Sequence, residues 1–232
     1  MGRRSDHSRD ELRAMILAAA RDIAEREGLR GLTTRKIANR IGYSVGTLYN
    51  VFANSDDLVN HLNAETLESL YQSCARAATV RPLDRTPQQP PQQAPEQMPE
   101  QMPEQTPEEM LRALARRYIA YVAAHPNLWG VVLDHSQPNG QDPPDWLEAK
   151  VTALLGLAEA ALAPLFPSGT ESERLHSARV LWAALYGIST LGFAGKIDKS
   201  ETMTALIDTL VAYYLAGVRQ LGLKLQAPAN PD

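Results

Sequence analysis

The sequence predicts an all-α protein in which a small N-terminal helical head precedes a larger helical bundle. Two observations indicate this fold class. Apolar residues recur at helical spacing in one segment after another, and both Gly and the Val/Ile/Thr clusters that mark sheet proteins are sparse. The hydrophobic share of 44% over 232 residues is ordinary for a protein with a buried core. We expect the head over residues 1–54, the bundle over 55–226 and a flexible tail over 227–232.

The head begins with a helix whose start is marked by a capping box. Ser8 and Glu11 occupy the two ends of an S-x-x-E motif, in which each side chain accepts from the other residue's backbone N–H. Apolar residues then repeat at helical spacing until Gly28 ends the run. A short second helix is predicted from Thr34, as its N-cap residue, to Ile41.

A third helix follows after a glycine. Gly42 suits the left-handed position that commonly ends a helix. The third helix is predicted to begin at Ser44 and to turn Leu48 and Phe52 inward. The head is therefore expected to be a bundle of three helices, the last two of them short.

The predicted bundle begins with a longer helix capped by Asn54 or Ser55. Asp56 and Asp57 lie in its first turn, where the helix dipole favours negative charge. The other long helices are predicted over residues 108–124, 146–165, 173–194 and 200–221. The last two carry apolar residues on more than one face, which favours an interface between helices of two copies.

Residues 81–107 interrupt the helical pattern. This Pro/Gln-rich stretch contains a four-residue repeat, Pro95-Glu-Gln-Met and then Pro99-Glu-Gln-Met, that is incompatible with a regular helix. We expect a disordered insertion that serves as a tolerated spacer. A binding segment for a partner that reads polyproline is the alternative.

The charge of the chain is unevenly distributed. The net charge is −4, but the first fifty residues hold ten Lys and Arg against six acids, a balance of +4. The remainder carries 13 cations against 21 acids, a balance of −8. This asymmetry favours a phosphate-facing module attached to a body with another task.

Several function classes lack their usual sequence signals. Cys74 is the only cysteine, which excludes an intramolecular disulfide and a multi-cysteine zinc site. No HExxH motif, phosphate-binding glycine loop or Cys–His pair is present, so we expect no catalytic residue, no metal and no cofactor. The N-terminus has no apolar signal and no segment resembles a membrane span, which predicts a cytoplasmic protein with no membrane partner.

Residues 31–58 have the layout of a helix-turn-helix, whose second helix lies in the major groove of DNA. Such a helix brings its free N–H groups close to phosphates. Its first turn, Val45-Gly46-Thr47, is small enough for close approach, and the hydroxyls of Ser44 and Tyr49 can bond the DNA backbone. Arg35-Lys36, at the start of the preceding helix, can reach a base edge or a phosphate.

The same stretch resembles the N-terminal motif of the TetR-type transcriptional regulators over about residues 11–62. The matching residues are Gly31-Leu32-Thr33-Thr34-Arg35-Lys36-Ile37-Ala38, Gly42, Gly46-Thr47-Leu48-Tyr49, Phe52 and Leu58. The resemblance implies base or phosphate contacts, and the residues expected to bind DNA are Thr34, Arg35, Lys36, Tyr43, Ser44, Val45, Gly46, Thr47, Tyr49 and Asn50.

The chain departs from the family pattern at two places. Val51 stands where many members have His, and Asn54-Ser55-Asp56-Asp57 replaces a run that contains Lys in many members. The missing lysine removes a phosphate contact, and the two aspartates add local repulsion. We expect a salt dependence of DNA binding smaller by about one unit of slope for the lost contact.

The C-terminal part resembles one TetR subgroup less closely. Trp182-Ala-Ala-Leu-Tyr186-Gly187 is similar to a Trp-x-x-x-His-Gly signature, with Tyr in place of His. In the family, this domain dimerises through its last two helices and encloses a small-molecule pocket. The candidate ligand-binding residues here are Tyr118, Tyr121, Trp129, His135, Trp146, Trp182, Tyr186 and Phe193. Each of them is also compatible with an ordinary place in a helical core.

The resemblance and the charge layout together predict a homodimeric repressor that a small effector releases from its DNA operator. With few inward charges expected, an apolar or aromatic effector with one polar group is favoured. Three alternatives remain open at this point. The chain is an activator, a helical sensor whose DNA-binding head is vestigial, or an enzyme, which the scattered acids and histidines do not support.

Overall fold

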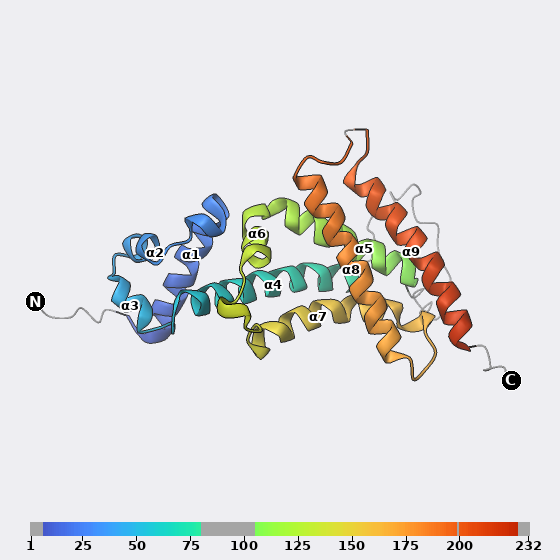
Figure 1. The fold of residues 1–232 in the computed structure, drawn as a ribbon, viewed down its shortest axis with the longest axis horizontal. Coiled ribbons are helices and arrows are strands. Elements are labelled where there is room, and N and C mark those ends of the chain that lie inside the picture. Colours follow the sequence, from blue (N-terminus) through green and yellow to red (C-terminus); the bar gives the residue numbers. More distant parts are fainter. Residues whose placement is uncertain (1–6, 80–104, 199, 227–232) are drawn as a thin grey trace, which may run out of the picture. The chain divides into compact units, whose positions relative to one another are not determined.

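The computed structural model describes residues 7–79, 105–198 and 200–226, and Figure 1 shows the helices that these residues form. No strand occurs in these ranges, so the predicted all-α fold class is confirmed. The α-helices are α1 (Arg9–Gly31), α2 (Thr34–Ile41), α3 (Val45–Tyr49), α4 (Ser55–Thr79), α5 (Pro107–Ala124), α6 (Pro126–Asp134), α7 (Asp145–Leu162), α8 (Glu171–Phe193) and α9 (Met203–Gln226). Two single 3-10 turns are η1 (Pro138–Gly140) and η2 (Ala163–Leu165).

The contacts between residues divide the chain into two compact units. The described residues of Met1–Ser73 and Tyr118–Leu155 form the first unit, and those of Cys74–Arg117 and Gly156–Asp232 form the second. The boundary predicted after residue 54 stays a prediction. Most of the Pro/Gln-rich insertion predicted over 81–107 and the tail predicted over 227–232 lie outside the described residues.

The end of that insertion serves as a helix start. Thr106 and Glu109 form a reciprocal capping box, in which Glu109 Oε2 accepts the Thr106 N–H at 2.9 Å and Thr106 Oγ1 accepts the Glu109 N–H at 3.2 Å. These hydrogen bonds lower the pKa of Glu109 below its usual value. The helix therefore begins at Pro107, where proline lacks a donor that the first turn would leave unpaired anyway.

Local capping defines the helices of the head largely as the sequence predicts. The capping box of Ser8 and Glu11 is formed at the start of α1. Gly28, at a φ of 64°, leaves the helical conformation, and Gly42, at a φ of 74°, ends α2 in the left-handed region. Positive φ is costly for residues with a Cβ, so glycine suits both positions.

One predicted cap is wrong by one residue. The N-cap of α2 is Thr33, not Thr34, because Thr33 has the extended backbone of a cap and its hydroxyl accepts the Lys36 N–H at 3.4 Å. Thr34 instead becomes the first residue of the helix. Either threonine satisfies the sequence rule, and the backbone path after α1 decides between them.

The first unit has a core that combines the head with a helix far along the chain. Leu48 and Phe52 are buried in it, as predicted, among apolar residues of α1, α2 and α4. Leu128 and Val131 of α6 belong to the same buried cluster. The Asn127 side chain also donates to the Glu25 carbonyl of α1 at 2.8 Å. Within the first unit, α6 therefore packs directly against the helices of the head.

The second unit pairs α8 with α9. Their packing buries Ala178 and Leu181 of α8 and Ile207 and Val211 of α9. Arg116 of α5 forms an ion pair with Asp208 of α9, at 2.8 and 3.0 Å from its two carboxylate oxygens. Helix packing in this unit is therefore supported by both apolar contacts and an ion pair at its surface.

Candidate nucleic-acid interface and effector pocket

Helix α3 presents small and polar groups on one side because its apolar side chain points the other way. Leu48 is 1% exposed, whereas its neighbour Tyr49 is 49% exposed. Ser44, Gly46 and Asn50 are exposed as well. Leu48 anchors the short helix to the core, so the outer side is free for another molecule to approach closely.

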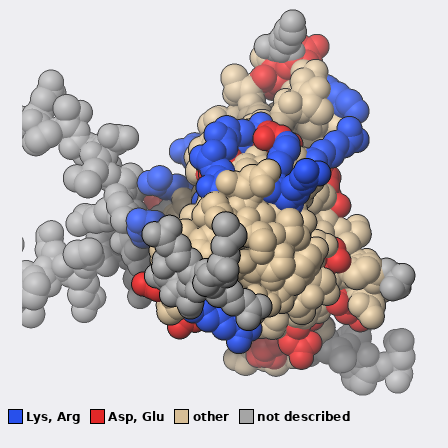
Figure 2. Space-filling view, turned by 90° about the vertical axis from the view of Figure 1, so that its left-hand side faces the viewer, with Lys and Arg blue, Asp and Glu red and all other residues tan. Residues whose placement is uncertain are grey.

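Cations near this surface differ in whether they are already paired. Lys36 forms an ion pair with Glu27, and Arg40 forms one with Asp22. Arg35 is exposed and forms no ion pair with any residue that the structure describes. Figure 2, viewed from the side of α2 and α3, shows Lys and Arg gathered around a largely uncharged area. An anion approaching α3 meets the Arg35 charge without first breaking an ion pair.

The hydroxyl groups around the turn are partly engaged with one another. Ser44 Oγ lies 3.1 Å from Thr47 Oγ1, and Ser44 makes no capping bond to the helix backbone. The Tyr43 hydroxyl lies 2.7 Å from Nδ1 of His7, in the segment before α1. All ten residues that the sequence assigns to DNA binding thus fall on or beside α2, α3 and the turn between them.

The departures from the family pattern have local structural roles. Val51 packs against the head core, and its carbonyl accepts from Arg9 at 3.4 Å. Asn54 Oδ1 accepts the Asp57 N–H at 2.8 Å, and Asp57 Oδ2 accepts the Ala53 N–H at 2.9 Å. Asn54 is therefore the cap of α4, and Asp57 returns a bond across the same turn.

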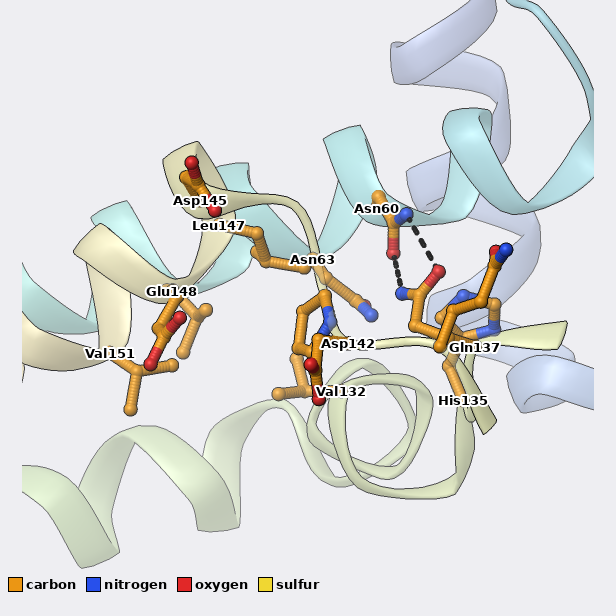
Figure 3. A pocket seen from close by; sticks show the side chains of 13 residues that line it. Asn60, Asn63, Val132, His135, Gln137, Asp142, Asp145, Leu147, Glu148 and Val151 are labelled. Carbon is orange, nitrogen blue, oxygen red and sulfur yellow. Dashed lines mark hydrogen bonds between the residues drawn. The ribbon is translucent and has the colours of Figure 1, made fainter. Parts of the chain in front are cut away.

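A pocket of about 660 Å³ lies in the first unit, beside α4, α6 and the start of α7. Figure 3 shows Asn60, His135 and Gln137 at one end and Asp145, Glu148 and Val151 at the other. The described lining residues are Asn60, Asn63, Leu67, Val132, His135, Gln137, Gln141, Asp142, Pro143, Asp145, Leu147, Glu148 and Val151. The volume is in the range that drug-sized ligands occupy.

Two amides close one end of this pocket by bonding to each other. Gln137 Nε2 donates to Asn60 Oδ1 at 2.7 Å, and Asn60 Nδ2 donates to Gln137 Oε1 at 3.3 Å (Figure 3). Asn63, one turn further along α4, is only 3% exposed, and its Oδ1 is buried with no hydrogen-bond partner in the described structure. A buried acceptor without a donor is unfavourable, so Asn63 is a costly residue at this position of α4.

Two histidines on this side of the unit are biased toward their neutral forms. Burial lowers the pKa of His135, and the Asp56 carboxylate, 3.9 Å from its Nε2, opposes that shift. Burial, together with the nearby Arg13 guanidinium, lowers the pKa of His61. His61 stacks on Trp146 with ring centroids 4.6 Å apart. At neutral pH, His135 therefore contributes no positive charge to the pocket.

The structure places the eight predicted ligand-binding residues at several different locations. Of these, His135 lines this pocket. Tyr118 and Trp129 are buried against each other with ring centroids 5.6 Å apart, and Tyr121 donates to the Thr66 carbonyl at 3.2 Å. The remaining four are exposed or partly exposed, and they are Trp146, Trp182, Tyr186 and Phe193.

The two asparagines of α4 that line the pocket were not among the predicted ligand-binding residues. Asn60 and Asn63 stand at helical spacing beside buried Leu67, so they interrupt an otherwise apolar face. Polar residues within an apolar stripe are a usable signal, since burial without a partner is costly. Gln137 and Asp142 carried no such signal, because they lie in a turn-rich segment whose path the sequence does not predict.

Helix α6 connects the pocket to the head. Its Leu128 and Val131 are in the head core, whereas Val132 and the following His135 line the pocket. At its start, His125 Nδ1 lies 3.7 Å from Glu25 of α1. A displacement of this nine-residue helix would therefore change the packing of both the head core and the pocket wall.

The outer faces of α8 and α9 expose large apolar side chains. Tyr213 is 76% exposed and Leu223 is 66% exposed. The others are Val180, Trp182, Leu191, Phe193 and Leu221. An apolar surface of this kind, in the second unit, is typical of a protein–protein contact.

In the three described ranges, no group of three or more His, Cys, Asp and Glu side chains comes together as metal ligands do. No helix within those ranges is long and apolar enough to cross a membrane.

Two family models match the chain. The model described as "Bacterial regulatory proteins, tetR family" matches residues 16–62, and "Tetracyclin repressor-like, C-terminal domain" matches residues 111–214. No curated protein matches the sequence. The TetR subgroup with the Trp-His-Gly signature is not confirmed and stays a prediction.

Solved structures share the fold at low sequence identity. A Rhodococcus sp. RHA1 protein of unknown function is 19% identical, with a TM-score of 0.67, and the match covers 93% of this chain and 98% of that one. A TetR-like transcriptional regulator from Rhodococcus sp. RHA1 is 18% identical, with a TM-score of 0.55, and the match covers 90% of this chain and 96% of that one. The transcriptional regulator FadR from Bacillus subtilis, solved with stearoyl-CoA, is 16% identical, with a TM-score of 0.59, and the match covers 88% of this chain and 98% of that one.

Proposed function

Because this chain belongs to the TetR family of bacterial regulators, and is thus a ligand-responsive, DNA-binding transcriptional regulator, we propose that it acts as a homodimeric repressor. The repressor binds its operator through α2 and α3 and leaves it when a small effector occupies the pocket beside α6. The observation that carries the proposal is the position of α6, which shares its residues between the head core and the pocket wall.

The proposed DNA surface follows from exposure and free charge. Arg35 is exposed without an ion pair in the described structure, and Tyr49 stands out from α3 beside exposed Gly46. We assign Arg35 to a base edge or phosphate and Tyr49 to a phosphate. The other proposed contacts are Thr34, Lys36, Tyr43, Ser44, Val45, Thr47 and Asn50. Lys36 has to exchange its bond with Glu27 for one with DNA.

The proposed release is a shift between two states of the protein. An effector that fits the pocket better in one position of α6 stabilises that position by its difference in affinity for the two states. Because Leu128 and Val131 fasten α6 to the head, the favoured position of α6 also sets the orientation of the recognition helix. The effector lowers operator affinity by the same factor by which DNA lowers effector affinity.

The proposed dimer forms through the exposed apolar faces of α8 and α9. Members of the family dimerise, and burying Tyr213 and Leu223 against a second copy removes apolar surface from water. A two-fold dimer presents two copies of α3, which then read half-sites one DNA turn, or a multiple of it, apart. The proposal assigns no reaction to the chain and, since its target is DNA, places it in the bacterial cytoplasm.

Capture of genomic fragments by the purified protein, followed by anisotropy titration of the best fragment at several salt concentrations, tests this function. We expect a near-palindromic site whose affinity falls by about 1–3 kcal/mol in Arg35→Gln, with a salt slope smaller by about one unit. Lys150→Gln is the matched control, because it removes the same charge from an ion pair with Glu68 on α4, outside the head. Its operator affinity is expected to be unchanged.

Failure of the proposal has a clear signature. A folded, dimeric protein that enriches no fragment over bulk DNA would favour the sensor with a vestigial head. An enriched site whose removal from a promoter lowers expression would make the protein an activator instead of a repressor.

A further inference from the structure

The chain just before α1 lies against the proposed DNA surface. His7 Nδ1 is 2.7 Å from the hydroxyl of Tyr43, which precedes α3, and the two rings meet edge to face with centroids 6.1 Å apart. Two residues after His7, Arg9 Nη2 lies 3.4 Å from the Val51 carbonyl, just beyond the end of α3. Figure 1 shows α1 beginning beside α3. The start of α1 therefore contacts residues on both sides of α3, although none of its residues is among the predicted DNA contacts.

Both partners of the contact between His7 and Tyr43 stand next to a helix cap. His7 directly precedes Ser8, the N-cap residue of α1, whose reciprocal hydrogen bonds with Glu11 fix the start of that helix. Tyr43 directly follows Gly42, and its backbone N–H donates to a carbonyl of α2 at 3.0 Å. Neither ring is fully buried, so the pair stays accessible from outside. The contact is thus held by defined backbone on both sides and faces a molecule that approaches α3.

The hydrogen bond between these two rings decides what the Tyr43 hydroxyl can offer to DNA. A phenol oxygen is a much weaker base than an imidazole nitrogen, so between the neutral groups the O–H donates to Nδ1 of His7. Phosphate oxygens accept hydrogen bonds, so a hydroxyl whose hydrogen is bonded to His7 has none to give them. A protonated histidine carries hydrogen on both ring nitrogens. Its Nδ1 then donates to the tyrosine oxygen, and the hydroxyl hydrogen is released.

We propose that His7 is a positioning residue for DNA binding, whose protonation turns the Tyr43 hydroxyl toward a backbone phosphate and adds a positive charge beside it. The inference rests on the proposed function, because it takes α2 and α3 as the DNA surface. Since DNA then favours the protonated form of His7, the affinity for DNA rises as the pH falls through the range in which histidines titrate. The gain is lost again as the pH rises through that range.

The groups around His7 leave it as the one that titrates at this contact. Of the described residues, Tyr43 faces it from the turn after α2, and Glu11 faces it from α1. Hydrogen bonds from Ser8 and, less strongly, the His7 charge lower the pKa of Glu11 below its usual value. Tyrosine hydroxyls as a class keep their proton up to about pH 10. Between about pH 5 and about pH 8, His7 is therefore the member of this group whose charge changes.

Anisotropy titrations of operator DNA across this pH range test the inference. His7→Asn keeps an amide near the position of Nδ1 but cannot become charged. From about pH 8 to about pH 5.5, we expect the gain in affinity to be about tenfold larger in the unmodified protein than in His7→Asn. At the lower pH, the salt slope of the unmodified protein is expected to be larger by about one unit.

A matched control removes a histidine outside the head. His176→Asn, at an exposed position of α8, is expected to keep the pH profile of the unmodified protein. The other histidines are present in all these proteins, so their contributions cancel in the comparison. Thermal unfolding verifies that both variants fold.

A second variant shows whether His7 acts through Tyr43. Tyr43→Phe removes the hydroxyl and keeps the ring. In that background, His7→Asn is expected to weaken DNA binding at low pH by no more than about twofold, since no hydroxyl is left to turn. An effect of about tenfold in the Tyr43→Phe protein would overturn the positioning role.

The outcomes separate this inference from the proposed function. An operator bound with the same pH dependence by the unmodified protein and by His7→Asn would contradict the inference and leave the repressor in place. Phosphate contacts do not depend on base sequence, so the same titrations apply to a duplex of arbitrary sequence. If no genomic fragment is captured but His7→Asn removes the pH dependence of binding to that duplex, the inference stands and the proposed function fails. If neither result is obtained, both fail.

Discussion

The helix-turn-helix and the α8–α9 pair expose opposite kinds of surface. In the head, Leu48 and Phe52 turn inward, and α3 exposes Gly46, Tyr49 and Asn50. In the second unit, α8 and α9 bury one apolar face and still leave side chains such as Tyr213 and Leu223 in the open. A helix whose apolar anchor is buried, as Leu48 of α3 is, needs no further apolar partner and offers polar groups to another molecule. A helix with apolar residues left over still needs a partner.

Neighbouring residues of α3 separate folding from DNA binding and give the largest expected effect. Leu48→Ala should lower the free energy of unfolding by about 2–5 kcal/mol, because it leaves a cavity in the head core. Tyr49→Ala should change that free energy by less than about 0.5 kcal/mol while weakening operator binding. Denaturant unfolding and anisotropy measure the two effects. Equal destabilisation by both variants would mean that α3 has no separate outer surface.

A charge on α8 tests whether the exposed apolar face needs a partner. Leu191→Glu should raise the dimer dissociation constant at least about thirtyfold, near 2 kcal/mol, since it places a charge in an apolar contact. Thr152→Glu, at an exposed position of α7, is the control with an unchanged constant. Sedimentation equilibrium reads both. A Leu191→Glu protein that dimerises normally would exclude this face from the interface.

The buried face of the α8–α9 region is tested by a glycine of α9. A Cβ added at Gly222 would lie 2.3 Å from the Leu165 carbonyl oxygen, which is backbone and cannot easily give way. Gly222→Ala should therefore lower the free energy of unfolding by about 1–3 kcal/mol. Gly156→Ala on α7 meets nothing within 4 Å and should raise it by up to about 1 kcal/mol. A stabilised Gly222→Ala protein would contradict this packing.

The smallest expected effect concerns the cap of α2. Thr33→Ala should destabilise the protein by about 1 kcal/mol, because the Lys36 N–H loses its acceptor. Thr34→Ala, one residue into the helix, should leave the unfolding free energy nearly unchanged. Thermal unfolding compares the two variants directly. The reverse order would restore Thr34 as the cap.

The helices were predictable because their signals are local. Ser8 and Glu11, three residues apart, form the capping box of α1, and Gly42 ends α2 within the turn that the sequence indicates. Asn54, one of two candidates for the cap of α4, is the one whose side chain accepts the Asp57 N–H. Errors of one residue, such as the cap of α2, arise where two neighbours have the same chemistry.

The candidate pocket was much less predictable. Its walls bring Asn60 and Asn63 together with residues from 132 to 151, about seventy to ninety positions further along the chain. The aromatic residues that sequence reasoning favours lie mostly in the core or on the surface. Of the predicted ligand-binding residues, His135 is the one that meets Asn60, Asn63 and the acids in this pocket.

By itself, the sequence determined the all-α class, the helix-turn-helix, and the surplus of apolar residues in the last two helices. These features depend on periodicity and on capping within a few residues. Only the tertiary structure decided that α6 joins the head core to an acid-rimmed pocket. Such a site depends on which distant segments pack together, and no individual residue in it carries a signal of that packing.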